Sequence, residues 1–155
     1  MENKPFNVES LEVSTDVTRV DWNELALVIE RAPLGKRDPG RTERSFLGSY
    51  LCCFVYDNEE SPKLVGAGRA LSDGETHSAI YDLVVLPEYQ GQGIGKLILE
   101  FLLERLPKLN VMLVSVPSKL PFYEKHGFRR LTTGCVRLES ETLWQERGYL
   151  APRSE

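Results

Sequence analysis

The sequence predicts a mixed α/β fold, built on a mostly antiparallel sheet that contains one parallel pair of strands. Apolar stretches at 50–56, 64–71 and 80–86 follow one another through short polar turns, a pattern typical of antiparallel strands. The stretch 80–86 is joined by a helical segment to another apolar stretch at 110–116. Because a strand–helix–strand crossover connects parallel strands, we expect these last two to pair in parallel.

The length and charge of the chain limit the function classes. With 155 residues it fits a single domain spanning 1–155, long enough to bury roughly two-thirds of its unfolded surface. The net charge of −4 argues against a nucleic-acid partner. No apolar stretch approaches the roughly 18 residues of a membrane span, and the first residues lack the apolar core of an export signal. We therefore expect a cytoplasmic protein without nucleic-acid or membrane partners.

The N-terminal third contains one strand and two helices by its pattern. Residues 6–14 alternate apolar and polar side chains and predict a half-exposed strand. Asp21 is placed to cap a helix, with Glu24 as its capping-box partner. A second short helix is expected at 41–49, with Phe46 and Leu47 facing inward.

The region between and after the central strands contains further local signals. Gly66 and Gly68 interrupt an apolar strand and indicate a bulge or the close approach of another part of the chain. Beyond 116, we expect a short helix around 119–126, one or two closing strands at 128–138 and one or two last helical turns at 140–147.

Three cysteines, Cys52, Cys53 and Cys135, show no metal-ligand spacing. Cys52 and Cys53 are neighbours in an apolar strand, which indicates packed free thiols. We expect no metal site.

The most informative segment follows the central strand. Pro87 ends the strand because proline cannot donate to a sheet ladder. Gly91, Gly93 and Gly95 come next, and a helix begins among them. A glycine-rich loop that opens a helix presents backbone N–H groups and the positive end of the helix dipole, so this segment predicts a phosphate site.

Two common phosphate-binding templates do not fit this loop. A P-loop requires Ser or Thr after the lysine, but Leu97 follows Lys96. The dinucleotide fingerprint requires a glycine where this chain has Lys96. A different phosphate ligand is therefore indicated.

At these residues the chain resembles the GNAT superfamily of acyl-CoA-dependent N-acetyltransferases. The matching motifs are Val85-Leu-Pro87 with Gln90-Gly-Gln-Gly93-Ile-Gly95, and Phe122-Tyr-Glu-Lys-His-Gly-Phe128. The resemblance covers roughly residues 50–130 and implies helices on both faces of the sheet. The segment 64–96 also resembles, more weakly, the branch with small-amine acetyltransferases of the serotonin type.

The resemblance implies acetyl-CoA as co-substrate, bound along one continuous segment. Main-chain groups of the strand would pair with the pantetheine arm, and loop amides would hold the pyrophosphate. Lys96 adds a charge that is equally well explained as a solvated lysine, and the family's cofactor-binding asparagine is replaced here by serines. The implied cofactor-binding residues are Leu83, Val84, Val85, Gln90, Gly91, Gln92, Gly93, Ile94, Gly95, Lys96, Ser118 and Tyr123.

The chemistry of direct attack needs a neutral amine and a proton for the leaving thiolate. By resemblance Tyr123 is the general acid, since a phenol can protonate a thiolate. Asp82, a carboxylate in an apolar strand, is either a general base or amine anchor, or a structural carboxylate paired with an arginine such as Arg69. The glutamate base of some members has no counterpart at Ser78-Ala79, so a water relay and the absence of any base are further alternatives.

The expected acceptor is a primary amine of a small molecule, and the candidate lining residues are Pro33, Arg37, Phe46, Tyr50 and Tyr81. Two alternatives remain open: a protein or peptide amine as acceptor, and a non-catalytic acyl-CoA-binding module on the same fold. A homodimer is implied by the resemblance alone.

Overall fold

The computed structural model describes residues 7–107 and 110–153. The chain divides into two compact units, Met1–Leu113 and Val114–Glu155. The single domain expected over 1–155 stays a prediction. Among the described residues, no helix has both the length and the apolar character needed to cross a bilayer.

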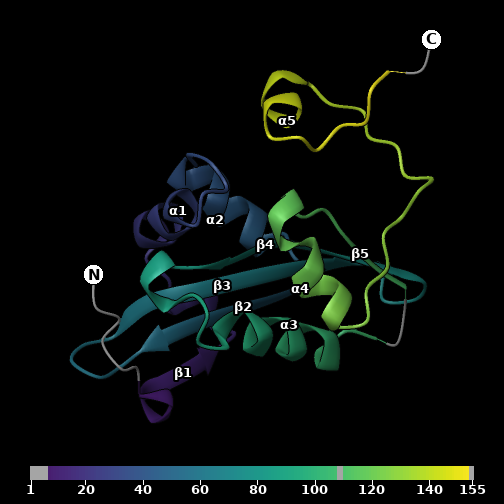
Figure 1. Ribbon diagram of the computed structural model, residues 1–155. Helices are drawn as coiled ribbons and strands as arrows, with labels where there is room; N and C mark the ends of the chain where they lie inside the picture. The colour runs from purple at the N-terminus through teal and green to yellow at the C-terminus, as the bar shows by residue number, and fades with distance from the viewer. Residues whose placement is uncertain (1–6, 108–109, 154–155) are drawn as a thin grey trace. The chain divides into compact units, whose positions relative to one another are not determined.

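The first unit is built on a five-stranded sheet (Figure 1). The strands lie in the order β1-β2-β3-β4-β5, and all neighbours are antiparallel except β4 and β5, which are parallel. The predicted mixed sheet with one parallel pair is therefore confirmed. The strands are β1 Leu11–Ser14, β2 Leu51–Asp57, β3 Lys63–Ser72, β4 His77–Val85 and β5 Asn110–Leu113.

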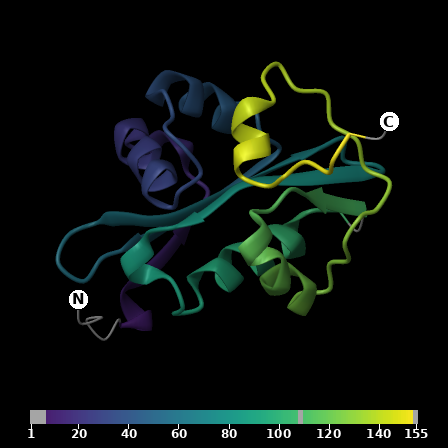
Figure 2. The same ribbon diagram turned by 45° about the horizontal axis from the view of Figure 1, so that its top comes forward.

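Three helices pack on this sheet, on opposite faces in both views (Figures 1 and 2). Helices α1 (Trp22–Arg31) and α2 (Pro39–Leu47) cover one face, where Phe46 of α2 stacks on Phe54 of β2 with 5.6 Å between ring centroids. Helix α3 (Ile94–Arg105) covers the other face. The helices expected on both faces are present.

Helix α3 packs closely on β3 because two positions of that strand have no side chain. A Cβ atom at Gly68 would lie 2.7 Å from Cγ2 of Ile98, and one at Gly66 would lie 3.0 Å from Cδ1 of Ile98. The ladders also contain irregularities at Val55/Tyr56 and at Ala67/Arg69. Both explanations offered for the glycines, a bulge and a close approach, are thus confirmed.

The caps of α1 and α2 explain where these helices begin. The Asp21 carboxylate accepts hydrogen bonds from the amides of Asn23 and Glu24, as predicted. The capping box is wrong, because the Glu24 carboxylate instead accepts the Leu64 N–H at 2.9 Å and ties α1 to β3. Helix α2 begins two residues earlier than predicted, since Asp38 caps it and Pro39 fits its first turn.

Other sequence predictions are corrected by tertiary packing. Leu47 is 55% exposed, so only Phe46 of the predicted inward pair is buried. Within the expected first strand, residues 8–10 form a 3₁₀ turn, and residue 6 lies outside the described residues. The parallel pairing of β4 with β5 extends only from His77 to Ile80, earlier in β4 than the predicted 80–86.

The second unit contains a 3₁₀ turn at Pro117–Lys119, helix α4 (Leu120–Lys125) and helix α5 (Thr142–Glu146). Gly127 follows α4 with φ +87°, the left-handed conformation expected for a glycine that ends a helix. The closing strands predicted at 128–138 are wrong, because that segment forms no strand. The described part of this unit has no strand for the segment to pair with, and most residues of the segment are exposed.

Candidate functional site

The loop before α3 exposes a run of unused backbone donors. Gly93 is the N-cap of α3 and provides no side-chain cap for the first turn. Within the described chain, the amides from Gly91 to Lys96 donate to no acceptor. Unpaired N–H groups at a helix N-terminus attract an anion through both hydrogen bonding and the helix dipole. The geometry therefore has the features of the phosphate site that the glycines predicted.

The glycines of this loop are required by conformation, and their surroundings are open. Gly91 and Gly93 have φ values of +75° and +89°, in the left-handed region that L side chains rarely adopt. A Cβ atom at either position would meet nothing within 4 Å. The backbone is therefore accessible to a ligand, and a side chain would project into that space.

Two side chains hold the loop against the end of β4. The Gln90 amide nitrogen donates to the Val85 carbonyl at 2.9 Å, and the Gln92 amide nitrogen donates to the Glu88 carbonyl at 3.0 Å. These bonds shape the loop and leave its backbone donors free. Lys96 is exposed and faces Glu100 at 3.7 Å, one helical turn away, as a solvated lysine would.

The edge of β4 that faces β5 is paired over only part of its length. The parallel ladder between the two strands ends at Ile80, while β4 continues to Val85 and runs on to the loop. On its other side, Val84 and Val85 pair with Ala67 and Gly66 of β3. The segment Leu83–Val85 and the loop thus form one continuous stretch of backbone, which we call the backbone rail (residues 83–96).

Asp82, immediately before the rail, has an unusual backbone. Its φ of +50° makes it the one non-glycine residue with positive φ in the described chain. The left-handed region is tolerated by Asp and Asn better than by most residues. Asp82 lies where the pairing of β4 with β3 shifts register, between Ala67 and Arg69 of β3, so β4 has a bulge at this residue.

The Asp82 carboxylate lies between two arginines from different parts of the unit. Its side chain is 5% exposed and accepts from Nε of Arg69 at 2.6 Å and from Nη2 of Arg37 at 2.8 Å. Arg69 belongs to the neighbouring strand, and Arg37 comes from the α1–α2 loop. The arginine partner considered for Asp82 is therefore present, and the second arginine was not anticipated.

Arg69 is held by rings as well as by Asp82. Its guanidinium carbon lies 5.2 Å from the Tyr81 ring centroid and 5.7 Å from the Phe46 ring centroid. Cation–π contacts of this kind favour a fixed guanidinium position. The structure therefore brings Asp82 and Tyr81 together around Arg69, on the face covered by α1 and α2.

The other candidate acceptor residues are placed differently. Phe46 is 1% exposed and belongs to the core, so it offers a ligand almost no surface. Tyr50 is 52% exposed and lies at the start of β2, near Gly74 in the β3–β4 turn. The structure does not bring Phe46 and Tyr50 to a shared surface beside Asp82.

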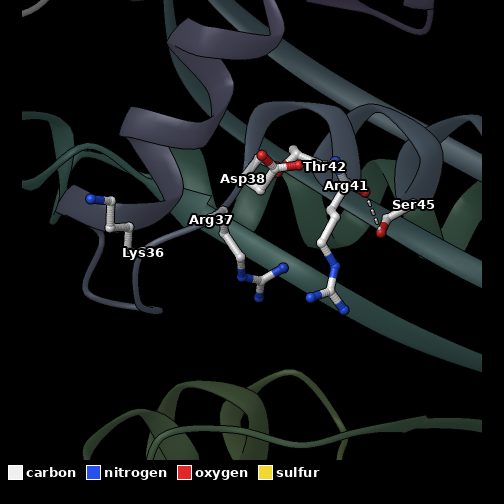
Figure 3. A pocket seen from close by; sticks show the side chains of 6 residues that line it. All are labelled: Lys36, Arg37, Asp38, Arg41, Thr42 and Ser45. Atoms are coloured by element: carbon white, nitrogen blue, oxygen red, sulfur yellow. Dashed lines mark hydrogen bonds between the residues drawn. The ribbon is translucent and has the colours of Figure 1, made fainter.

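A pocket of about 320 Å³ lies beside the α1–α2 loop (Figure 3). We call it the basic pocket; it is lined by Lys36, Arg37, Asp38, Arg41, Thr42 and Ser45. Arg37, one of the residues expected to line the acceptor site, lies in this pocket, which the α1–α2 loop forms with the first turns of α2. Arg37 links the pocket to Asp82.

Tyr123 lies in α4 of the second unit, between two aromatic rings. The centroids of Phe122 and Phe128 lie 5.0 Å and 5.9 Å from that of Tyr123. Burial raises the pKa of Tyr123 to about 12, so its phenol keeps its proton at neutral pH. Protonation is the state that a general acid requires. Ser118, in the turn before α4, is exposed.

The cysteines behave as the sequence suggested. Cys52 and Cys53 are buried, and desolvation raises the pKa of their thiols to about 11 and about 12. Cys135 is exposed. Residues 7–107 and 110–153 contain no group of three His, Cys, Asp or Glu side chains able to hold a metal ion.

Comparison with known proteins identifies the family. Residues 49–130, more than half of the chain, match the acetyltransferase (GNAT) domain. The uncharacterized N-acetyltransferase ycf52 of Porphyra purpurea is 32% identical over 83 residues, covering 52% of this chain and 48% of that protein. The histone acetyltransferase TAP1 of Glycine max is 28% identical over 120 residues, covering 70% of this chain and 52% of that protein.

A solved structure shares the fold. A probable acetyltransferase of unknown function from meticillin-resistant Staphylococcus aureus aligns with a TM-score of 0.73 and 23% identity, covering 84% of this chain and 99% of that chain. The chain belongs to the GNAT acetyltransferase family. It spans about half the length of the curated relatives reported above.

Proposed function

We propose that this protein is an N-acetyltransferase that moves an acetyl group from acetyl-CoA to the primary amine of a small molecule. The observation that carries the proposal is the backbone rail. An incompletely paired strand edge leads directly into a run of free amides at a helix N-terminus. Such a surface suits a ligand with an extended amide-containing arm and a pyrophosphate.

The residues of the rail fit coenzyme A by their donors and by their open space. Main-chain groups of Leu83, Val84 and Val85 would pair with the pantetheine amides. The amides from Gly91 to Lys96 would hold the pyrophosphate, because a Cβ atom at Gly91 or Gly93 would meet no other atom within 4 Å. When bound, acetyl-CoA supplies an activated thioester carbonyl for attack by the amine. The Val85 N–H is the proposed donor to the oxyanion.

We assign the leaving-group proton to Tyr123. A phenol with a pKa raised to about 12 is almost entirely protonated at pH 7 and can transfer its proton to a departing thiolate. The geometry of Asp82 favours a positioning role, because proton uptake would disrupt its bonds to Arg37 and Arg69. In this scheme the acceptor amine loses its proton through water.

The loop assignment is tested by acetyl-CoA binding. Gly93→Glu would put a negative side chain into the proposed phosphate space and should weaken binding by at least about tenfold, measured by calorimetry. Gly74→Glu is the matched control, since Gly74 also has positive φ, +77°, but lies in the β3–β4 turn. Unchanged binding by the Gly93 variant would refute the loop assignment.

The acceptor class is tested by thiol release from acetyl-CoA with a panel of amines. The panel contains arylalkylamines, suggested by the weaker resemblance to the serotonin-type branch, together with polyamines, amino acids and lysine peptides. A preference for lysine peptides would support a protein acceptor, the second candidate, which the similarity to the Glycine max histone acetyltransferase favours. Binding of acetyl-CoA without release to any amine would instead identify a non-catalytic module.

We also propose a reducing location such as the cytoplasm. Cys52 and Cys53 are adjacent buried free thiols, and Cys135 is an exposed free thiol. Exposed free thiols are typical of reducing compartments.

A further inference from the structure

The basic pocket concentrates positive charge in a chain whose net charge is −4. Its lining contains three cationic side chains, from Lys36, Arg37 and Arg41, and one carboxylate, from Asp38. That carboxylate is already used, because Oδ2 of Asp38 accepts the Arg41 N–H at 2.7 Å as the N-cap of α2. In Figure 3 the Asp38 side chain turns back to the helix. The pocket therefore holds an excess of positive charge.

The arginine donors of the pocket are mostly unused. In Figure 3 the guanidinium groups of Arg37 and Arg41 extend in the same direction, away from the α2 backbone. Arg37 uses one Nη for Asp82, and the side chains of Arg41 and Lys36 have no hydrogen-bond or ion-pair partner among the described residues. Like charges that share a pocket repel each other, and an anion placed between them removes that repulsion.

The position of the pocket connects it to the proposed reaction. Arg37 reaches Asp82, and Asp82 directly precedes Leu83, where the backbone rail begins. A group bound at the pocket thus lies next to the strand along which the acetyl donor is proposed to bind. The volume of about 320 Å³ matches the lower range of small-molecule sites.

We propose that the basic pocket binds an anionic group, a carboxylate or a phosphate, of a small acceptor whose primary amine is acetylated. This inference rests on the proposed acetyltransferase function and narrows its substrate class. Arginine is suited to the role because its planar guanidinium binds carboxylate and phosphate oxygens with paired hydrogen bonds. Arg41 and the free donors of Arg37 are the proposed anion ligands.

The first experiment compares amines that differ only in the anionic group. β-Alanine and n-propylamine have similar size and the same reacting amine, and O-phosphoethanolamine and ethanolamine form a second pair. At constant ionic strength, kcat/KM for at least one anionic member should exceed that of its neutral partner by at least about tenfold, as expected for a charge-assisted contact. The pair that responds distinguishes a carboxylate from a phosphate.

Variants then assign the preference to the pocket. Arg41→Gln should lower the ratio of kcat/KM for the anionic amine to kcat/KM for its neutral partner about tenfold, whereas Arg44→Gln should leave this ratio unchanged. Arg44 is an exposed arginine of the same helix that does not line the pocket. Circular dichroism of both variants checks that each remains folded, which is expected for exposed residues.

A binding measurement keeps this inference separate from the proposed function. Calorimetry with O-phosphoethanolamine, β-alanine and their neutral partners on the free protein needs no turnover. Binding of an anionic amine that Arg41→Gln abolishes would support the pocket even if no acetyl transfer occurs. Equal behaviour of charged and neutral amines, in both rate and binding, would overturn the proposal. Preferential acetylation of an acidic peptide over every small amine would overturn it too.

Discussion

Replacing Asp82 with asparagine removes one negative charge from a carboxylate that lies between two guanidinium groups. The Asp82 side chain is 5% exposed, and its partners Arg69 and Arg37 are 14% and 36% exposed. Asparagine keeps the shape and tolerates the left-handed backbone at φ +50°. The substitution therefore tests the charge with little added strain.

The expected loss in free energy of unfolding follows from how deeply each partner of Asp82 is buried. Removing one member of a buried ion pair costs about 3–5 kcal/mol. We expect about 3 kcal/mol, because Arg69 keeps a bond to Ser49 Oγ at 3.4 Å and its ring contacts. The half-exposed Arg37 contact should contribute no more than about 1 kcal/mol.

Urea unfolding of Asp82→Asn, Asp82→Ala and Asp82→Gly measures the loss of stability in each variant. Alanine at φ +50° adds about 1–2 kcal/mol of strain, so the glycine variant should be at least as stable as the alanine variant. In an ordinary strand position glycine is instead less stable than alanine. A cost below about 1 kcal/mol for Asp82→Asn would refute the ion-pair argument. Loss of the acidic limb of the pH–rate profile in Asp82→Asn would refute the positioning role and identify a general base.

Three further predictions concern packing and titration. Gly68→Ala should destabilise the fold by about 1–3 kcal/mol in urea because its Cβ would lie 2.7 Å from Ile98, and the cost should shrink in an Ile98→Ala background. Burial raises the pKa of Tyr123 to about 12, so above pH 10 the native state holds more protons than the unfolded state. Thermal stability should therefore fall as pH rises from about 10 to 12, and it should fall less steeply in Tyr123→Phe. The same variant should lose roughly 10²-fold in turnover while keeping its acetyl-CoA affinity. A thiol reagent should modify Cys135 rapidly, and Cys52 and Cys53 only after unfolding; fast reaction of all three would contradict the described core.

Local chemistry explains the predictions that were confirmed. Asp21 caps a helix because its carboxylate needs only the next few amides of the same segment. Gly91 and Gly93 need positive φ for the turn into α3, and that need depends on few neighbours. Apolar strands joined by short turns pair as antiparallel neighbours, since the partner strand is the next segment of the chain.

The wrong predictions involve partners that are distant in sequence or missing. The Glu24 carboxylate accepts the N–H of Leu64, 40 residues away, so a local capping rule could not find this donor. The segment 128–138 contains several apolar residues, but the described part of its unit has no strand for it to pair with. Leu47 continues an apolar pair but lies at the exposed end of α2.

By itself, the sequence determined the mixed sheet, its parallel pair and the glycine loop that opens α3. These depend on apolar periodicity and on backbone conformations that each segment requires locally. Only the tertiary structure decided the surroundings of Asp82. Arg37 lies 45 residues away in sequence, and the bulge at Asp82 turns its carboxylate to both arginines. The physical reason is that a buried charge must find its partners in space.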